Sequence, residues 1–533
     1  MKPAYYQGML ALLLAVTTSI AVENQRPGTP DWEITRPALH QEIEGYASLT
    51  SVNGGDAIEL LVSTHAPRYA IDVFRMGWYA GAGARRVAGP IVRTGIAQDV
   101  PPPDPSTGMV ACDWRDPYQL ETRDDSGPWP SGIYLARLTT IAARPERHAN
   151  DEGLQSFIVF VVRDDARASA LLFQSSVTTF AAYNNWGGKS LYGFNSGNAP
   201  ARKVSFDRPY ATNPYGVRLD GAGDFLRRWE YNAVRFLERE GYDVTYDTDV
   251  DTHERPLVDA DAPLRHRVYL SIGHDEYWSS PMRRHVEQAR DQGMHLAFLG
   301  ADVCYWQVRF EPNARGVANR TLVAYKEAAG SLDPLALDGQ PQNNRLITGR
   351  WRDRPVSRPE ARLVGVMYAA DPVDADIIVD RPDHWVFEGT GLKKGDALPG
   401  LLGYEVDAMS DTGPTSIVRL AHSPFTDQGS PQKVRYADMT VYSAESDALV
   451  FATGSIQWSW GLDGYNAPEW HSARVSEAAQ RITRNVLDRM LRTETVPHRK
   501  ETDWGPSPIV LLASVVAMAF VIRAWFWRRM KNR

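Results

Sequence analysis

Three short segments of the chain combine acid–base groups with aromatic side chains. Residues 273–279 read Gly-His-Asp-Glu-Tyr-Trp-Ser, residues 300–306 read Gly-Ala-Asp-Val-Cys-Tyr-Trp, and residues 178–188 carry a tyrosine, two asparagines and a tryptophan. Histidine, carboxylate and phenol groups are side chains that move protons and hold metal ions. A single polar turn of this kind most often caps a helix, so a functional site is indicated only where the three segments meet in space.

The sequence around these segments alternates between strand-like and helix-like patterns. The segments follow three short apolar runs, 168–173, 268–272 and 295–299. Between the last two runs, Ser280-Pro281 is typical of a helix start and Gly293 of a helix end. Alternating strands and helices predict a parallel sheet with helices on its faces. Such sheets bind ligands beyond the carboxyl ends of their strands, so the three segments are predicted to lie together there.

The pattern predicts two folded domains of different class. Residues 45–164 contain short alternating runs separated by glycine-rich turns and no helical stretch, which indicates a β-sandwich. Residues 165–495 are predicted to form the α/β domain, with a β-rich extension between about 309 and 463. Residues 22–44 are polar and rich in proline, and we expect a linker or an extended entry to the sandwich.

The two ends of the chain resemble targeting segments. Residues 1–21 combine a charged start, a short apolar core and a small-x-small exit, which is typical of a signal peptide cleaved after about Ala21; a retained anchor is the alternative. A linker at 496–507 leads to 508–527, an apolar stretch that suits a membrane helix, and the basic tail 528–533 is typical of a cytoplasmic end. The protein is therefore expected to be exported and held at the cell membrane by one span, with its body outside.

Composition narrows the classes of function. With 43% hydrophobic and 23% charged residues the chain is ordinary for a globular protein, and a formal net charge of −7 gives no indication of nucleic-acid binding. The two cysteines, Cys112 and Cys304, lack zinc-site spacing; an exported compartment permits a disulfide, but the sequence does not pair them. Acids alternate in 247–251 as in a calcium loop, but the glycine and distal glutamate of an EF-hand are missing, which favours a solvated loop or an N-cap cluster.

Several ordered motifs resemble the catalytic region of the large subunit of N,N-dimethylformamidase. They are Ala-Tyr-Asn at 182–184 with Trp-Gly-Gly at 186–188, the segments 273–279 and 300–306, Gly-Tyr-Glu-Val-Asp at 403–407, and residues 454–463. The resemblance covers about residues 45–490 and includes Arg-Met-Gly-Trp-Tyr at 75–79. It implies a glutamine-amidotransferase-like α/β fold and hydrolysis of an amide at a mononuclear iron held by two tyrosinates and a glutamate.

The resemblance also implies metal ligands. Glu276, in His-Asp-Glu, would be the carboxylate ligand, and Tyr183, in Ala-Tyr-Asn, would be a phenolate ligand. Tyr192 and Tyr210 are both candidates for the second phenolate, because neither aligns cleanly with the family's motif. A Lewis-acidic metal beside a carboxylate is in itself a coherent arrangement for hydrolysis.

Three further residues are expected around the metal by the same resemblance. His274 would lie beside the ligands, Glu405 would be the general base acting on water, and Asp302 stands where the family's pattern has an asparagine, which adds a negative charge. The family's companion small subunit is not encoded here, so an oligomer or a separate small subunit is an expected partner. The expected substrate is a small-molecule or wall-derived amide.

Two other interpretations fit the same segments. In the first, Cys304 is a nucleophile with His274 as its base, and Glu276 or Asp275 orients the histidine. The bulky Tyr305 after the cysteine and the ready oxidation of an exported thiol count against it. In the second, the protein is a non-catalytic surface module that binds glycan or wall polymer through its sandwich and aromatic turns. Metal-dependent hydrolysis of a C–N bond is the preferred interpretation.

Overall fold

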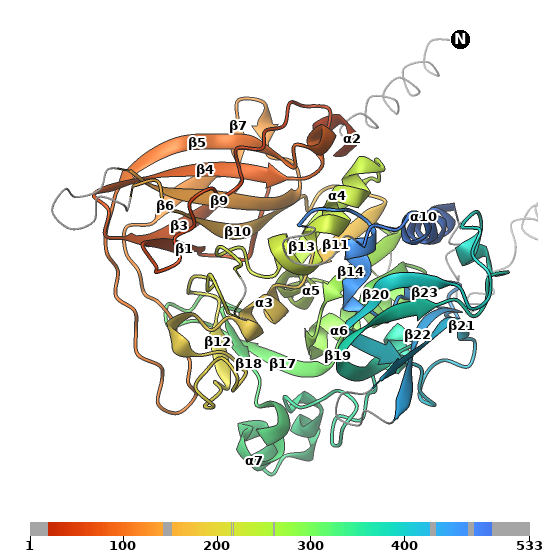
Figure 1. The fold of residues 1–533 in the computed structure, drawn as a ribbon. Coiled ribbons are helices and arrows are strands. Elements are labelled where there is room, and N and C mark those ends of the chain that lie inside the picture. Colours follow the sequence, from red (N-terminus) through yellow and green to blue (C-terminus); the bar gives the residue numbers. More distant parts are fainter. Residues whose placement is uncertain are drawn as a thin grey trace, which may run out of the picture. The chain divides into compact units, whose positions relative to one another are not determined.

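In a computed structural model, the chain folds into several β-sheets with helices packed against them (Figure 1). The structure describes residues 20–141, 152–214, 216, 218–259, 262–426, 433–466 and 474–492. Most of the predicted signal peptide, and all of the predicted C-terminal linker, membrane helix and basic tail, lie outside these ranges. Within them, none of the helices has the length and apolar character needed to cross a membrane.

Two sheets packed face to face form the N-terminal part of the fold, as the alternating runs in 45–164 predict. One sheet has the strand order β2-β10-β9-β4-β5 and the other β1-β3-β6. Ile58 and Leu60 of one sheet share a buried core with Ile71 and Phe160 of the other. The strands are β1 Ile43–Ala47, β2 Ser51–Asn53, β3 Ala57–Thr64, β4 Arg68–Met76, β5 Ala84–Thr94, β6 Tyr118–Glu121, β9 Gly132–Ile141 and β10 Gln155–Arg163, with a small ribbon of β7 Arg123–Asp124 and β8 Gly127–Pro128.

A seven-stranded sheet with the order β13-β11-β14-β16-β23-β22-β21 forms the centre of the α/β domain. The first five strands run parallel, which confirms the predicted parallel sheet, and β22 and β21 continue it antiparallel. Strands β14 and β16 are buried along their whole length, as expected of a sheet covered on both faces. The strands are β11 Leu171–Ser175, β13 Val244–Thr248, β14 Val268–His274, β16 His295–Ala301, β21 Val418–Thr426, β22 Val434–Ser443 and β23 Leu449–Ala452.

Different helices cover the two faces of this sheet. Met282 of α6 belongs to one buried core with Phe298, and Phe236 of α4 belongs to another with Leu270. Ser279 caps α6 by accepting a hydrogen bond from the N–H of Met282, so this helix begins where the sequence predicts. The main helices are α3 Val177–Tyr183, α4 Tyr231–Arg239, α5 Asp249–Glu254, α6 Ser280–Asp291 and α10 Glu477–Arg492, with the π-helical turn η3 Phe225–Trp229 before α4.

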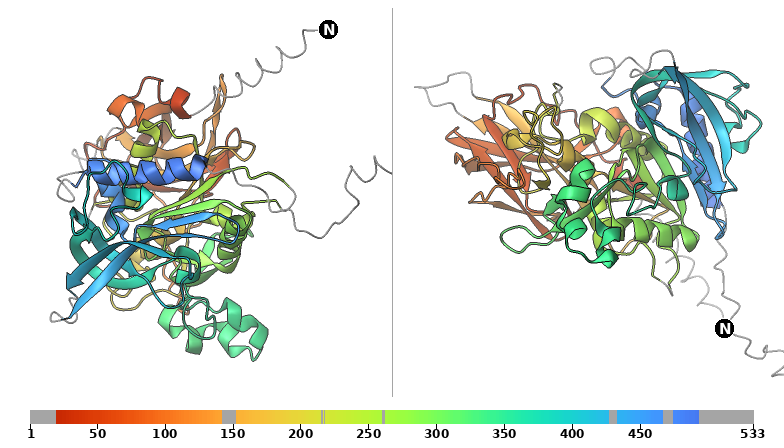
Figure 2. Two further views of the ribbon diagram at one scale, coloured as in Figure 1. Left: turned by 90° about the vertical axis from the view of Figure 1, so that its right-hand side faces the viewer. Right: turned by 90° about the horizontal axis from the view of Figure 1, so that it is seen from below.

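In the β-rich extension, β17 and β18 complete a four-stranded sheet, β12-β18-β17-β15, with two strands from earlier in the chain, and β19 and β20 form a two-stranded ribbon. The ribbon lies with β21 and β22 on the side of the α/β sheet away from the sandwich (Figure 2). The strands are β12 Lys203–Ser205, β15 Tyr277–Ser279, β17 Trp306–Glu311, β18 Thr321–Val323, β19 Met367–Ile378 and β20 Ala397–Ala408. Short helical segments are α2 Ile20–Glu23, η1 Tyr79–Gly81, η2 Trp186–Gly188, η4 Lys326–Ala328, α7 Ala329–Leu332, α8 Pro334–Leu337, η5 Pro341–Leu346, α9 Ala361–Val364, η6 Trp385–Phe387 and η7 Ile456–Gly461.

The sandwich and the α/β domain share a buried polar contact. Arg75 of β4 forms a salt bridge of 2.8 Å with Glu238 of α4, and both side chains are fully buried. Tyr246 donates a hydrogen bond to the same glutamate. The segment 22–44, expected to be a linker, lies against this contact, since the side chain of Asn24 also donates to Glu238.

Candidate active site

The segments that follow β11, β14 and β16 meet at one edge of the seven-stranded sheet, as predicted. Strands β14 and β16 pair in parallel, so that His274 at the end of β14 lies beside Ala301 at the end of β16. Helix α3, which follows β11, ends at Tyr183. Glu276 lies in the turn after β14, and its N–H donates to the hydroxyl of Thr179 in α3. The strand register therefore brings three segments into one place.

Two glycines allow the ends of β14 and β16 to pack closely against each other and against Trp229. Gly273 and Gly300 are partners in the pairing of β14 with β16. A Cβ atom on Gly300 would lie 2.2 Å from the carbonyl oxygen of Gly273, and one on Gly273 would lie 2.4 Å from Cβ of Trp229. Gly273 also has a φ of 69°, a conformation that favours glycine. The glycines that open the segments 273–279 and 300–306 are therefore part of the geometry of the site.

Two tyrosine hydroxyls converge on the carboxylate of Glu276. The hydroxyl of Tyr183 donates to Oε2 at 2.9 Å, and that of Tyr192 lies 2.9 Å from Oε1 and 3.0 Å from Oε2. The two rings stack with their centroids 4.2 Å apart. Tyr277 donates to the hydroxyl of Tyr192 at 2.5 Å and so fixes its position. One carboxylate and two phenols thus share a small volume.

The other candidate tyrosine, Tyr210, lies apart from this group. Its ring packs edge-on against Phe180, with centroids 6.3 Å apart. Burial and then the charge of Asp249 raise the pKa of Tyr210. The pKa of Tyr192 is raised by burial and then by the charge of Glu276. Of the two tyrosines that the sequence leaves open, Tyr192 is the one placed beside Glu276.

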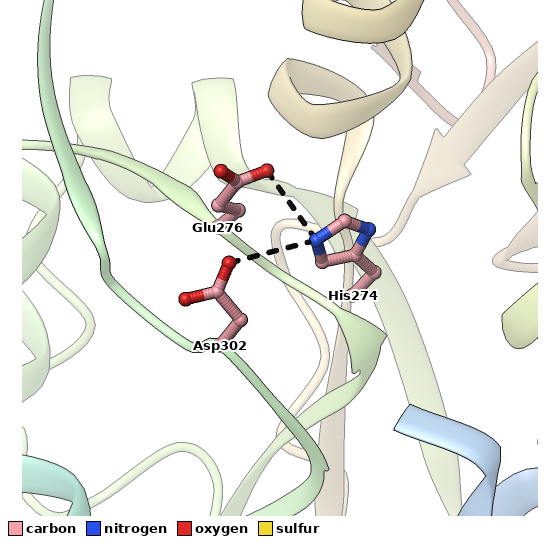
Figure 3. A group of neighbouring side chains, drawn as sticks. All are labelled: His274, Glu276 and Asp302. Carbon is pink, nitrogen blue, oxygen red and sulfur yellow. Dashed lines mark ion pairs between the residues drawn. The ribbon is translucent and has the colours of Figure 1, made fainter. Parts of the chain in front are cut away.

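His274 lies among three carboxylates, two of which are drawn in Figure 3. Its Nε2 is 3.3 Å from Glu276 Oε2, 3.2 Å from Glu405 Oε2 and 3.9 Å from Asp302 Oδ2. Burial by itself lowers the pKa of His274, but these carboxylates outweigh burial and raise that pKa well above its ordinary value. Burial and the neighbouring carboxylates raise the pKa of Asp302, whereas His274 outweighs burial and lowers the pKa of Glu405. The cluster therefore favours protons on His274 and Asp302 and an ionised Glu405.

Glu405 reaches the cluster from β20 of the ribbon. The N–H of Asp302 donates to Asp407 Oδ1 at 2.8 Å, which ties the turn after β16 to β20. The N–H of Gly403 donates to the hydroxyl of Ser455 at 3.0 Å, which ties β20 to the turn after β23. These two bonds flank Glu405 and hold it over the end of the sheet.

Asp302 Oδ1 is buried without a hydrogen-bond partner among the described residues, and His274 Nε2 and Glu405 Oε2 face each other at 3.2 Å without hydrogen-bond geometry. Ligand atoms of His274, Glu276 and Asp302 lie within 4.8 Å of one another, the one such group of histidine, cysteine and acidic side chains in the described part of the chain. Buried polar atoms are unfavourable unless a partner or an ion satisfies them. With three carboxylates and two phenols gathered here, the residues present fit a cation with a preference for oxygen ligands.

A comparison with models of protein families matches residues 70–472 to the family described as N,N-dimethylformamidase beta subunit-like, C-terminal. The chain belongs to this family. The match begins in β4 of the sandwich and contains every residue of the cluster, from Tyr183 to Glu405. A search of curated proteins finds no match.

Lys326 is a further residue beside the cluster, and no sequence motif marks it. Its Nζ lies 3.3 Å from the centre of the Tyr192 ring and 4.9 Å from that of Trp306. Burial lowers the pKa of Lys326, against the opposing charge of Glu276. The one local signal that points to it is its position shortly after the end of β18.

Cys304 does not take part in the site of this dimethylformamidase-like chain. Its side chain is fully buried, and burial raises the pKa of its thiol far above the ordinary value. Cys112 lies in a different buried cluster, and both thiols are free. A nucleophilic cysteine needs an accessible thiol of low pKa. Burial and the raised pKa of its thiol therefore count against the alternative interpretation of Cys304 as a nucleophile.

Proposed function

We propose that this protein hydrolyses a carbon–nitrogen bond of the amide type, with a mononuclear iron held by Glu276, Tyr183 and Tyr192. The observation that carries the proposal is the convergence of two tyrosine hydroxyls on one carboxylate, beside a histidine and two further carboxylates. Membership in the dimethylformamidase-like family supports it, because the family is named for an enzyme that acts on an amide. Bound at these ligands, iron would polarise an amide carbonyl or lower the pKa of a water molecule.

We assign proton transfer in the proposed reaction to Glu405 and His274. Glu405 Oε2 and His274 Nε2 lie 3.2 Å apart, within reach of direct proton transfer. Hydrolysis requires a base that takes a proton from water as its oxygen bonds to the carbonyl carbon, and an acid that protonates the nitrogen as the C–N bond breaks. We assign the first role to Glu405 and the second to His274. Amide and water then yield a carboxylic acid and an amine.

Asp302 and Lys326 have supporting roles in the proposal. Asp302 lies 3.9 Å from His274 Nε2 and helps to orient the imidazole between the carboxylates. The ammonium group of Lys326 places a positive charge over the ring of Tyr192, which would favour the ionised phenol. The proposed substrate is a small-molecule or wall-derived amide.

Purified full chain tests the proposal through two readouts, iron content by elemental analysis and amine release from a panel of small amides. Glu276→Gln and Tyr183→Phe are expected to lose both iron and activity, because each removes a ligand. Glu405→Gln is expected to keep the iron while kcat falls by about 10²–10⁴-fold, the usual contribution of a general base. A metal ligand is therefore recognised by the loss of both iron and activity, and a residue that only transfers protons by the loss of activity alone.

Two results would overturn the proposal. One is full activity of folded, metal-free wild-type protein, which would exclude the metal. The other is binding of glycans without turnover of any amide, which would favour the non-catalytic surface module.

A further inference from the structure

A cavity lies between the end of the sandwich strand β10 and the α/β sheet. Its volume is about 290 Å³, and its wall includes Asp165, Leu172, Asp247, Arg255, Leu257 and His266. Of the described residues on this wall, none belongs to the candidate active site. The volume is about ten times that of a water molecule in the liquid and close to the lower limit of small-molecule pockets.

The acidic motif 247–251 contributes Asp247 to this wall, and one oxygen of its carboxyl group has no hydrogen-bond partner among the described residues. Thr248 and Asp251 cap α5 through reciprocal hydrogen bonds, which confirms the predicted N-cap cluster, and Asp249 accepts from the N–H of Thr178. Asp247 has no such role. Its side chain is only 7% exposed, and its Oδ1 has no hydrogen-bond partner among the described residues.

The arginines near Asp247 are paired with other acids. Arg163 contacts Asp165 and Asp251 at 3.0 Å each. Arg255 contacts Asp165 at 2.7 Å and Asp251 at 3.4 Å. A buried carboxylate without a partner of its own is unfavourable, and burial followed by the charge of Asp251 raises the pKa of Asp247 well above its ordinary value. A bound cation would lower this pKa again and favour the ionised carboxylate. The wall therefore presents one carboxylate that would gain from a cationic partner.

His266 supplies a second hydrogen-bond acceptor on the same wall. His266 Nδ1 lies 2.9 Å from the hydroxyl of Ser169 and 3.3 Å from the carbonyl oxygen of Ser169. Because a carbonyl oxygen can only accept, both contacts are satisfied when the hydrogen of the neutral imidazole is on Nδ1. This tautomer leaves a lone pair on Nε2. Burial lowers the pKa of His266 to about 4, so the imidazole is neutral at pH 7.

We propose that this cavity binds a small alkylammonium ion, with its ammonium group on Asp247 and its alkyl chain against Leu172 and Leu257. An ammonium group has three N–H donors and a compact charge, which suits one carboxylate and one neutral imidazole. A directly coordinated metal ion fits less well, because the described carboxylates on this wall do not converge as metal ligands do. An anion fits less well because Arg163 and Arg255 are already paired with acids, and Arg265, the remaining arginine on the described wall, is exposed and donates to the carbonyl oxygen of Asp165.

Calorimetric titration of the full chain with propylammonium chloride tests this proposal, with 1-propanol as a neutral probe of similar length. Saturable binding of one propylammonium per chain is expected, and none of propanol. Asp247→Asn keeps the size of the side chain and removes its charge, so the affinity should fall by at least about tenfold. Asp259→Asn removes a charge from an exposed residue on the same wall and should change the affinity by less than about twofold.

Two further variants separate this site from others. Val258→Trp fills the cavity without altering Asp247, so it should abolish binding, and it serves where Asp247→Asn does not fold. Glu405→Gln should leave propylammonium binding unchanged. If Glu405→Gln abolished binding and Asp247→Asn did not, the ligand would bind at the candidate active site, and the proposal would be overturned. Absence of propylammonium binding, or calcium binding in its place, would also overturn it.

Discussion

The hydroxyl of Tyr192 makes the contact with Glu276 that the hydroxyl of Tyr210 lacks. If Tyr192 is a metal ligand, we expect Tyr192→Phe to lower the iron bound per chain by at least about tenfold. Tyr210→Phe removes the same atom from a tyrosine outside the cluster and should leave the iron content unchanged, which makes it a matched control. Elemental analysis of both purified variants measures the difference, and equal iron loss would contradict the assignment.

Position in the sheet explains which site residues could be predicted from the sequence. His274, Glu276 and Asp302 follow strands of a parallel sheet, and the carboxyl ends of such strands share one edge. The local pattern does not decide between Tyr192 and Tyr210, because both lie in irregular chain after α3. No sequence pattern predicts that Lys326 lies at the site, because its contact with the ring of Tyr192 depends on tertiary packing.

The strand pair β14–β16 requires a glycine at its end. In Gly300→Ala, the new Cβ would lie 2.2 Å from the carbonyl oxygen of Gly273. The two strands must therefore move apart at their carboxyl ends, next to His274 and Asp302. We expect a loss of about 2–4 kcal/mol in the free energy of unfolding, and a loss of iron. Urea denaturation measures the first. Gly330→Ala is the control, because nothing lies within 4 Å of its Cβ, and a comparable loss there would contradict this explanation.

Glu230 joins the start of α4 to the end of β11 and makes stability depend on pH. It accepts hydrogen bonds of 2.8 Å from the hydroxyl of Ser175 and the N–H of Ser176, and burial raises its pKa from 4.5 to about 8. The folded state therefore binds the proton more tightly. The resulting stabilisation is full below pH 4.5 and is lost as the pH rises toward 8.

Glu230→Gln should remove this pH dependence, because glutamine does not titrate. The free energy of unfolding of the wild type is expected to fall more steeply between pH 5 and 8 than that of the variant, by up to about 1 kcal/mol per pH unit. Urea denaturation at each pH provides the comparison. Parallel curves for the two proteins would show that Glu230 does not contribute.

Continuous apolar runs explain why the central strands were predictable and the ribbon was not. The runs 268–272 and 295–299 fall within β14 and β16, which are buried on both faces. Strands β19 and β20 mix buried and exposed residues and pair with several register shifts. Their place over the sheet depends on contacts such as the bridge between Val406 and Ser455, which no local pattern encodes. Only the family resemblance therefore points to Glu405.

At the scale of the whole molecule, the sequence predicts a sandwich and an α/β domain but not how they are joined. The join includes a fully buried ion pair, Arg75 with Glu238. Arg75 also donates to the carbonyl oxygen of Ser131, while Glu238 accepts from Asn24 and Tyr246. Residues that read as a polar linker thus supply part of the interface, because their partners come from distant parts of the chain.

This ion pair should be strongly coupled, because each charge is buried and the other is its main counter-charge. Arg75→Met leaves Glu238 without its cation, and we expect a loss of about 3–5 kcal/mol in the free energy of unfolding. Glu238→Gln leaves Arg75 unpaired and should cost a similar amount. The double variant removes both charges, so its loss should be smaller than the sum of the two single losses by at least about 1.5 kcal/mol. Urea denaturation of all four proteins measures this coupling. Additive losses would mean that the two domains are held together by the surrounding contacts and not by the pair itself.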